Sequence, residues 1–223
     1  MPKLYFRYGA MGSGKTVNLL VALFEYRSAQ KKAFLIKPRV DVRRGSKTVW
    51  SRIPGLTAEA DLVLSYYEEL STRQLSQIGQ SDCVFVDEIQ FFHPKQVEQL
   101  SWLSLSVPVI CYGLRTDYRG RLFPGSAAMF AWADSVAEIK NVCRFCPQKA
   151  THNFKRVQSS FETDEKVGVT LGADDLYVGV CKSCFYLKRS SEDDRLVEFE
   201  IYKHDPVIIE PEPESFSLEK NIA

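Results

Sequence analysis

Long apolar runs are missing from this chain of 223 residues, and none approaches the length that crosses a bilayer. An excess of one charge is missing too, since 29 Lys and Arg oppose 28 Asp and Glu. The first absence argues against a membrane-spanning protein. The second argues against a stable nucleic-acid partner, because such proteins usually carry a basic excess. Residues 1–4 lack the layout of a signal peptide, so we expect a cytoplasmic location.

The composition that remains is ordinary for a globular protein, with 45% hydrophobic and 26% charged residues. A sizeable core is therefore available. The length permits one large domain, or one domain with a small satellite. No internal repeat stands out.

Six cysteines divide into two kinds. Cys83 and Cys111 stand alone inside apolar runs, and we expect them to be small buried hydrophobic residues. The other four form two C-x-x-C pairs: Cys143, Cys146, Cys181 and Cys184. Four thiolates complete a tetrahedral zinc site, and a site without an open position is structural. Two disulfides or a redox pair are the competing interpretations, which a cytosolic context disfavours.

The motif G-A-M-G-S-G-K-T occupies residues 9–16 and fits the P-loop pattern. It follows an extended apolar stretch, 4–8, and precedes a helical-looking run, 17–29. Glycines let successive backbone N–H groups point at phosphate oxygens, and the helix N-terminus adds its dipole. Lys15 would reach the β and γ phosphates of ATP, and Thr16 would place its hydroxyl on magnesium.

The first half of the chain alternates strand and helix signals, which predicts a parallel sheet covered by helices. The expected strands are 33–36, 62–64, 83–86 and 107–112. Helices are expected over 67–80 and from Pro94 onward, and 38–54 is expected to be a loop with marginal extended pieces. We predict a nucleotide-binding domain at 1–140, a zinc-containing domain at 141–200 and a flexible acidic tail at 205–223. A tail docked through 207–209 is the alternative.

An acidic pair, Asp87 and Glu88, follows the apolar strand at 83–86. The carboxyl end of a parallel strand faces the crevice where ligands bind. We expect Asp87 to hold magnesium together with Thr16, and Glu88 to accept a proton or orient water. The same four letters, D-E-I-Q, also resemble the box of helicase-type motors. A nucleic-acid-stimulated ATPase with a zinc ribbon is therefore an alternative, although the chain is too short for a second motor domain. A zinc-ribbon binding module that uses ATP as a switch is a third hypothesis.

Together these motifs resemble those of type II, or cellular-type, thymidine kinases, in their bacterial form. The P-loop is similar to the family's G-x-M-x-S-G-K-[ST], and V-D-E-I-Q-F-F is similar to its second motif. The stretch Y-G-L-R-T-D-Y-R-G-R-L-F-P-G-S and the two cysteine pairs also match. L-G-A-D-D-L-Y-V-G-V-C resembles the family's substrate-binding lasso, here residues 170–177. The matches run in the right order from Leu4 to Cys184.

This resemblance implies a RecA-like P-loop domain with a small zinc-containing lasso domain. It implies transfer of the γ-phosphoryl group of ATP to the 5′-hydroxyl of thymidine, with deoxyuridine a further candidate acceptor. The product, thymidine monophosphate, would serve nucleotide salvage for DNA synthesis. A homotetramer and feedback inhibition by thymidine triphosphate are also implied, with Mg²⁺ and structural Zn²⁺ as cofactors.

The resemblance also assigns roles to residues. Glu88, Lys15 and Arg43, which lies in the family-like motif D-x-R, are the implied catalytic groups. The implied ATP-binding residues are Gly9, Ala10, Met11, Gly12, Ser13, Gly14, Lys15, Thr16, Asp87, Glu88, Ile89 and Gln90. The implied thymidine-binding residues are Met11, Phe91, Leu114, Tyr118, Phe123, Thr170, Leu171, Gly172, Ala173, Asp174 and Tyr177.

Two positions depart from the family pattern. Ala173 stands where a second lasso glycine is common. Tyr118 stands where phenylalanine is common, which adds a hydroxyl that needs a partner if it is buried.

Overall fold

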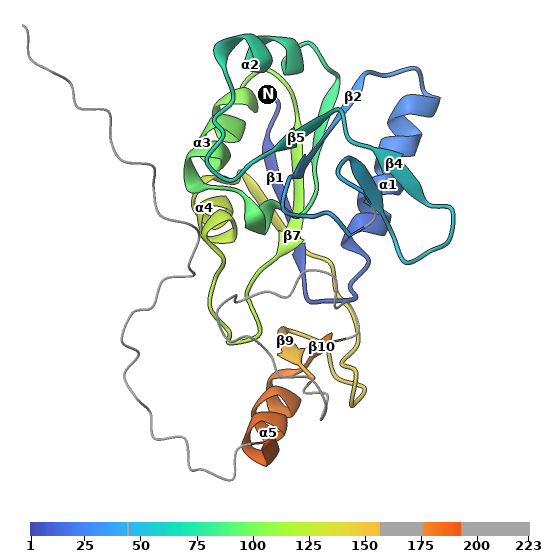
Figure 1. Ribbon diagram of the computed structural model, residues 1–223, viewed down its shortest axis with the longest axis vertical. Coiled ribbons are helices and arrows are strands. Elements are labelled where there is room, and N and C mark those ends of the chain that lie inside the picture. The colour runs from blue at the N-terminus through green and yellow to red at the C-terminus, as the bar shows by residue number, and fades with distance from the viewer. Residues whose placement is uncertain (44, 157–175, 193–223) are drawn as a thin grey trace, which may run out of the picture.

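The computed structural model describes residues 1–43, 45–156 and 176–192. Its centre is a six-stranded sheet in the order β5-β2-β6-β7-β1-β8, and every neighbouring pair is parallel (Figure 1). The predicted class, a parallel sheet flanked by helices, is therefore confirmed. Among the described residues, no helix is both long enough and apolar enough to cross a membrane.

The strands of this sheet are β1 Leu4–Gly9, β2 Ala33–Pro38, β5 Leu62–Leu64, β6 Cys83–Val86, β7 Val109–Leu114 and β8 Ser135–Glu138. The helices around it are α1 Lys15–Ser28, α2 Thr72–Ile78, α3 Pro94–Leu103 and α4 Pro124–Trp132, with a short 3₁₀ helix η1 at Ile89–Phe91. Two further hairpins pair β3 Thr48–Trp50 with β4 Thr57–Glu59, and β9 His152–Lys155 with β10 Tyr177–Val180. The helix α5, Lys182–Glu192, follows β10.

The sheet is buried on both faces, which explains the continuous apolar letters of its central strands. In β6, Val84 and Val86 join a core that α2, α3 and α4 cover, while Cys83 and Phe85 join a second core beneath α1. Figure 1 shows α3 and α4 on one side of the sheet and α1 on the other. The strands thus form the middle of a three-layer structure.

Parallel strands bring their carboxyl ends to one edge, and this edge carries the predicted motifs. The P-loop follows β1, and Asp87 follows β6. The small module of β9, β10 and α5 lies at the same end of the sheet (Figure 1). The fold therefore collects residues from both halves of the chain at one place.

Two element predictions need correction. The helix expected over 67–80 begins only at Thr72, because Ser71 forms a capping box with Gln74. Before it, Gln96 and Gln99 of α3 bind main-chain groups of 65–70, which replaces helical hydrogen bonds there. The strand expected at 107–112 runs instead from 109 to 114, where it pairs with β1 along its whole length.

Helix α4 approaches η1 so closely that only glycine fits at its second position. A Cβ on Gly125 would lie 2.8 Å from the carbonyl oxygen of Phe92 and would also collide with that of Ile89. Main-chain oxygens cannot rotate away as side chains can. We predict that Gly125→Ala lowers the free energy of unfolding by about 1–3 kcal/mol, as overpacking does.

Urea denaturation measures this change. The control is Ala127→Ser, on the exposed side of the same helix, which should stay within about 0.5 kcal/mol of the wild type. Equal stability of Gly125→Ala and wild type would contradict the close approach of α4 to η1.

Candidate functional site

The glycine loop forms the turn between β1 and α1, as its sequence predicts. Gly12 and Gly14 both have φ of 77°, a left-handed conformation that side chains disfavour. The ammonium group of Lys15 donates to the carbonyl oxygen of Ala10 at 2.9 Å, so it lies within the loop. Burial lowers the pKa of Lys15 to about 8, although the nearby Glu88 and Asp87 oppose this shift. The lysine and the acidic pair therefore share one electrostatic environment.

Asp87 is buried at the end of β6, with only 4% of its surface exposed. Burial raises its pKa, and the negative charges of Glu88 and Asp41 raise it further. A cation at this position would favour the ionised carboxylate. Asp87 and Thr16, at the start of α1, stay the predicted ligands of a divalent cation.

Glu88 has a strained backbone, with φ of 49° in a residue that is not glycine. Its carboxylate accepts hydrogen bonds from Arg43 at 2.8 Å and from the side chain of Gln90. Gln90 in turn accepts from the N–H of Leu114 at 2.9 Å. Contacts from three segments therefore fix this carboxylate, while 13% of its side chain stays exposed.

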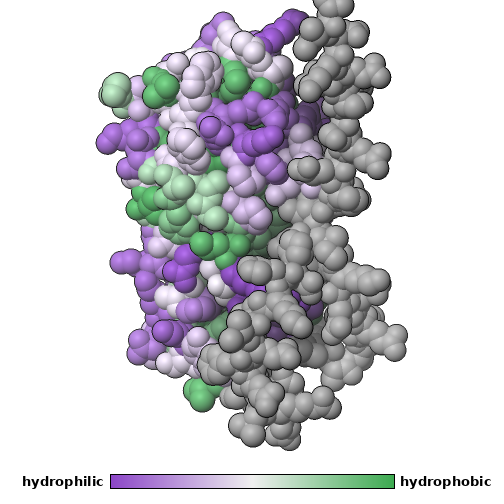
Figure 2. All heavy atoms as spheres, turned by 90° about the vertical axis from the view of Figure 1, so that its left-hand side faces the viewer, coloured by the Kyte–Doolittle hydropathy of each residue, from purple (hydrophilic) through white to green (hydrophobic). Residues whose placement is uncertain are grey.

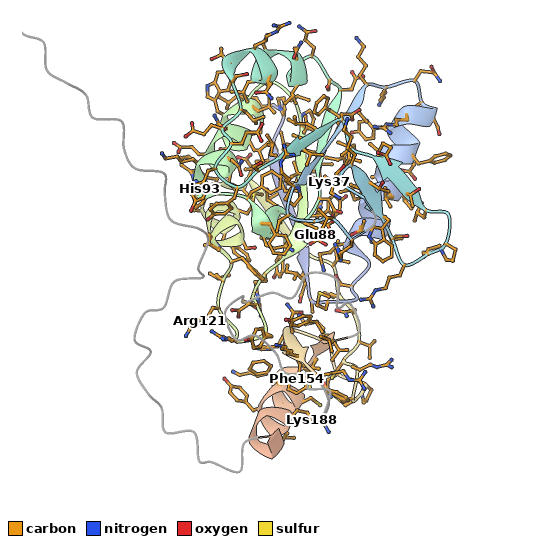
Figure 3. All side chains as sticks on the ribbon, in the orientation of Figure 1. Lys37, Glu88, His93, Arg121, Phe154 and Lys188 are labelled. Atoms are coloured by element: carbon orange, nitrogen blue, oxygen red, sulfur yellow. The ribbon has the colours of Figure 1, made fainter. Side chains whose placement is uncertain are left out.

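An ion-pair network with the buried residues Asp41 and Lys37 fixes the position of Arg43. It contacts Asp41 through two nitrogens, at 2.6 and 3.2 Å. Lys37 lies 3.6 Å from Asp41 and donates to the carbonyl oxygen of Thr48 at 2.8 Å. Burial alone would raise the pKa of Asp41, but Arg43 and Lys37 hold it below its ordinary value. Figure 3 shows Lys37 and Glu88 in this part of the sheet.

The sequence analysis did not include Lys37 among the site residues. The available signal was a single charge inside the apolar strand A-F-L-I-K-P, four residues before Asp41. A fully buried lysine needs a partner, and the nearest acid in the sequence supplies it.

The aromatic residues predicted for a thymidine pocket lie in two contacting pairs. The rings of Phe91 and Phe123 are 5.8 Å apart, and those of Tyr118 and Tyr177 are 6.0 Å apart. The hydroxyl of Tyr118 accepts from Arg119 at 3.0 Å, so the extra polar group has a partner. The predicted lasso residues Thr170, Leu171, Gly172, Ala173 and Asp174, and the predicted tail 205–223, lie outside the described residues.

The four paired cysteines converge, with all four sulfur atoms within 4.8 Å of one another. The sulfur of Cys146 lies 3.5 Å from that of Cys181 and 3.7 Å from that of Cys184. Four thiolates at a Zn–S distance of about 2.3 Å lie about 3.8 Å apart, so the cluster fits zinc. Cys83 and Cys111 are fully buried in the sheet, as predicted.

The parallel sheet, the glycine loop after β1 and the acidic residues at the end of β6 define a P-loop α/β protein. A family model described as thymidine kinase matches residues 2–185. The chain belongs to the thymidine kinase family.

Proteins named thymidine kinase are similar to the chain over most of its length. The protein of Ruegeria pomeroyi is 40% identical over 185 residues, which are 82% of this chain and 92% of that protein. That of Xanthomonas oryzae pv. oryzae is 40% identical over 189 residues, covering 83% and 90%. That of Salmonella choleraesuis is 39% identical over 187 residues, covering 82% and 89%. A solved structure described as a DNA replication initiation factor has a TM-score of 0.36 at 13% identity, covering 62% of this chain and 40% of that one.

The cysteine cluster leads to a prediction about metal content. We expect the purified protein to contain about one zinc per chain, because four thiolates complete one tetrahedral site. Cys181→Ser should lose most of this zinc and lower the melting temperature, since metal binding contributes to folding. Elemental analysis and thermal unfolding measure the two effects.

Ser183→Ala is the matched control, because this exposed residue lies between two of the ligands without offering a thiolate. It should keep its zinc. Full zinc occupancy in Cys181→Ser would show that the cluster is not the metal site.

Proposed function

We propose that the protein transfers the γ-phosphoryl group of ATP to the 5′-hydroxyl of thymidine, as part of nucleotide salvage for DNA synthesis. Membership of the thymidine kinase family supports the reaction. The observation that carries the proposal is the position of Glu88 after β6, at the same edge of the sheet as the phosphate loop that follows β1. A candidate base and a candidate phosphate site therefore lie at one edge of the sheet.

On the donor side, the loop's N–H groups and Lys15 hold the phosphates of ATP. Lys15 donates to main-chain oxygens of the loop, which fixes its ammonium group before a ligand arrives. Thr16 and Asp87 would hold Mg²⁺, which would neutralise charge on the phosphates. Such groups act by position and charge, since phosphoryl transfer asks little covalent chemistry of the protein.

On the acceptor side, Glu88 takes the proton from the 5′-hydroxyl. Its two oxygens offer about four acceptor positions, so the bonds from Arg43 and Gln90 leave room for the hydroxyl. Arg43 stands between the carboxylate and Asp41, where its charge also stabilises the transferring phosphoryl group.

The two aromatic pairs form the walls for the nucleoside, together with Met11 and Leu114. Tyr177 begins β10, at the end of the segment that contains the proposed lasso. We infer that 170–174 bind the thymine edge through main-chain groups, which offer both donors and acceptors. A site built in this way rejects bases that lack the matching groups.

From the same family membership we infer a cytoplasmic homotetramer restrained by thymidine triphosphate. Figure 2 shows the side of the molecule that carries α3 and α4, where apolar side chains gather on the surface. Exposed apolar residues of these helices include Trp102, Phe130 and Trp132. Such patches are typical of subunit contacts.

The alternative function, a nucleic-acid-stimulated ATPase, has only the letters D-E-I-Q in its favour. The near-neutral charge of the chain argues against it. It predicts faster ATP hydrolysis with single-stranded DNA.

The first test is thymidine-dependent formation of ADP, with Glu88→Gln as the variant. We expect wild-type ADP formation to require thymidine. Glu88→Gln should lower kcat by about 10²–10⁴-fold, because an amide cannot take the proton, while ATP still binds. A coupled assay gives kcat, and titration with ATP gives its affinity.

ADP formation that does not depend on thymidine but becomes faster with single-stranded DNA would support the alternative function. Near-normal turnover by Glu88→Gln would remove this residue as the base. Glu98→Gln, a change on α3 away from the strand edge, is the control and should turn over normally.

The network behind Arg43 leads to a separate prediction. Lys37→Met keeps the apolar stem but removes the positive charge beside Asp41. Asp41 then holds Arg43 in place less firmly. We expect kcat to fall by about 10- to 100-fold, as small displacements of catalytic groups do. Steady-state kinetics on the folded variant measures this change.

The control is Lys95→Met, because Lys95 also pairs with an acid, Glu69 at 3.8 Å, but on the exposed surface. It should keep wild-type kcat. Wild-type kcat in Lys37→Met would show that Asp41 alone positions Arg43.

A further inference from the structure

The phosphate loop is hydrogen-bonded to the cysteine module, residues 141–156 and 176–192, which contains the four paired cysteines. Both main-chain groups of Met11, in the middle of the loop, bind asparagine side chains from that module. The N–H of Met11 donates to Oδ1 of Asn153 at 2.7 Å, and its carbonyl oxygen accepts from Nδ2 of Asn141 at 3.1 Å. These bonds join residues that are 142 and 130 positions apart in the sequence.

Each asparagine lies close to a predicted zinc ligand. Asn141 stands two residues before Cys143. Asn153 lies opposite Gly179 in the hairpin, and Gly179 stands two residues before Cys181. The two arms are also joined to each other, because the N–H of Arg144 donates to the carbonyl oxygen of Gly179 at 3.0 Å. A metal at the cysteines would therefore fix the positions of both asparagines.

The hairpin and the loop are closely packed at Gly179. A Cβ on Gly179 would lie 2.6 Å from the carbonyl oxygen of Met11 and 3.0 Å from Nδ2 of Asn141. Asn153 is buried and makes a second bond, from Nδ2 to the carbonyl oxygen of Thr116 at 2.6 Å. The hairpin therefore packs directly against the main chain of the loop.

Asn141 uses one of its two polar atoms to bind the loop. Its Oδ1 is buried and lacks a hydrogen-bond partner among the described residues. An unpaired buried acceptor costs free energy, whereas the amide nitrogen of the same side chain satisfies the carbonyl oxygen of Met11.

We propose that Asn141 and Asn153 are positioning residues that couple the four-cysteine site to nucleotide binding at the phosphate loop. Metal at the cysteines holds the loop in its binding conformation. Because such coupling is reciprocal, nucleotide in the loop raises the affinity of the cysteines for metal. Differences in affinity lie mostly in the dissociation rate, so the metal should also be lost more slowly. The inference rests on the proposed binding of nucleotide phosphates at the loop, but it does not require thymidine as the acceptor.

The test uses the zinc-loaded protein without thymidine. A zinc-selective chromophoric chelator in excess reports the rate of zinc release, with and without a non-hydrolysable ATP analogue. We expect the analogue to slow release by about fivefold or more in the wild type. In the double variant Asn141→Ala/Asn153→Ala, the release rate should be insensitive to the analogue. The variant's affinity for the analogue, measured by calorimetry, should be roughly tenfold weaker.

Asn18→Ala is the matched control. Asn18 also bonds the loop, from Nδ2 to the carbonyl oxygen of Gly14 at 2.9 Å, but it belongs to α1 rather than to the cysteine module. Its zinc release should respond to the analogue as in the wild type. A purely structural role of Asn141 and Asn153 would lower the melting temperature and leave this response intact, which would overturn the proposal.

The wild-type measurement tests the coupling itself even if the double variant does not fold. A protein that binds the analogue but releases zinc at an unchanged rate overturns the coupling alone. A protein that does not bind the analogue overturns the proposed function and the coupling together.

Discussion

The ion pair between Arg43 and Glu88 is the interaction on which the rest of the site depends. It joins the segment after β2 to the end of β6, and Gln90 extends the connection to β7. Because parallel strands end at one edge, these groups meet beside the phosphate loop that follows β1. The strained backbone of Glu88 and the buried pair of Lys37 and Asp41 both serve to hold this arrangement.

The second constraint is the attachment of the cysteine module to the same edge. Figure 3 shows Glu88 toward the end of the sheet that lies next to Phe154 of the hairpin. The segment between β9 and β10 contains the proposed lasso. Asn153 of the hairpin accepts a hydrogen bond from the N–H of Met11. Donor and acceptor sites in the proposed reaction would then share one rigid support, which favours alignment of the reacting groups.

Much of this could be predicted from local sequence, and the rest could not for physical reasons. Local sequence predicts the P-loop, the acidic pair after β6 and the four cysteines, because their chemistry needs fixed residue types at short spacing. Helix α4 was missed because Pro124 and Gly125 resemble turn residues, whereas they serve a first-turn position and a close approach. The bonds of Asn141 and Asn153 to Met11 join distant segments, so no spacing rule finds them.

The central claim is that the carboxylate of Glu88 and the phosphate loop act on one pair of substrates. A crystal structure with thymidine and a non-hydrolysable ATP analogue tests it most directly. The account predicts the γ-phosphate beside Lys15 and the 5′-hydroxyl at about 2.6–3.2 Å from a Glu88 oxygen. Thymidine bound elsewhere, with its 5′-hydroxyl out of reach of Glu88, would contradict the account.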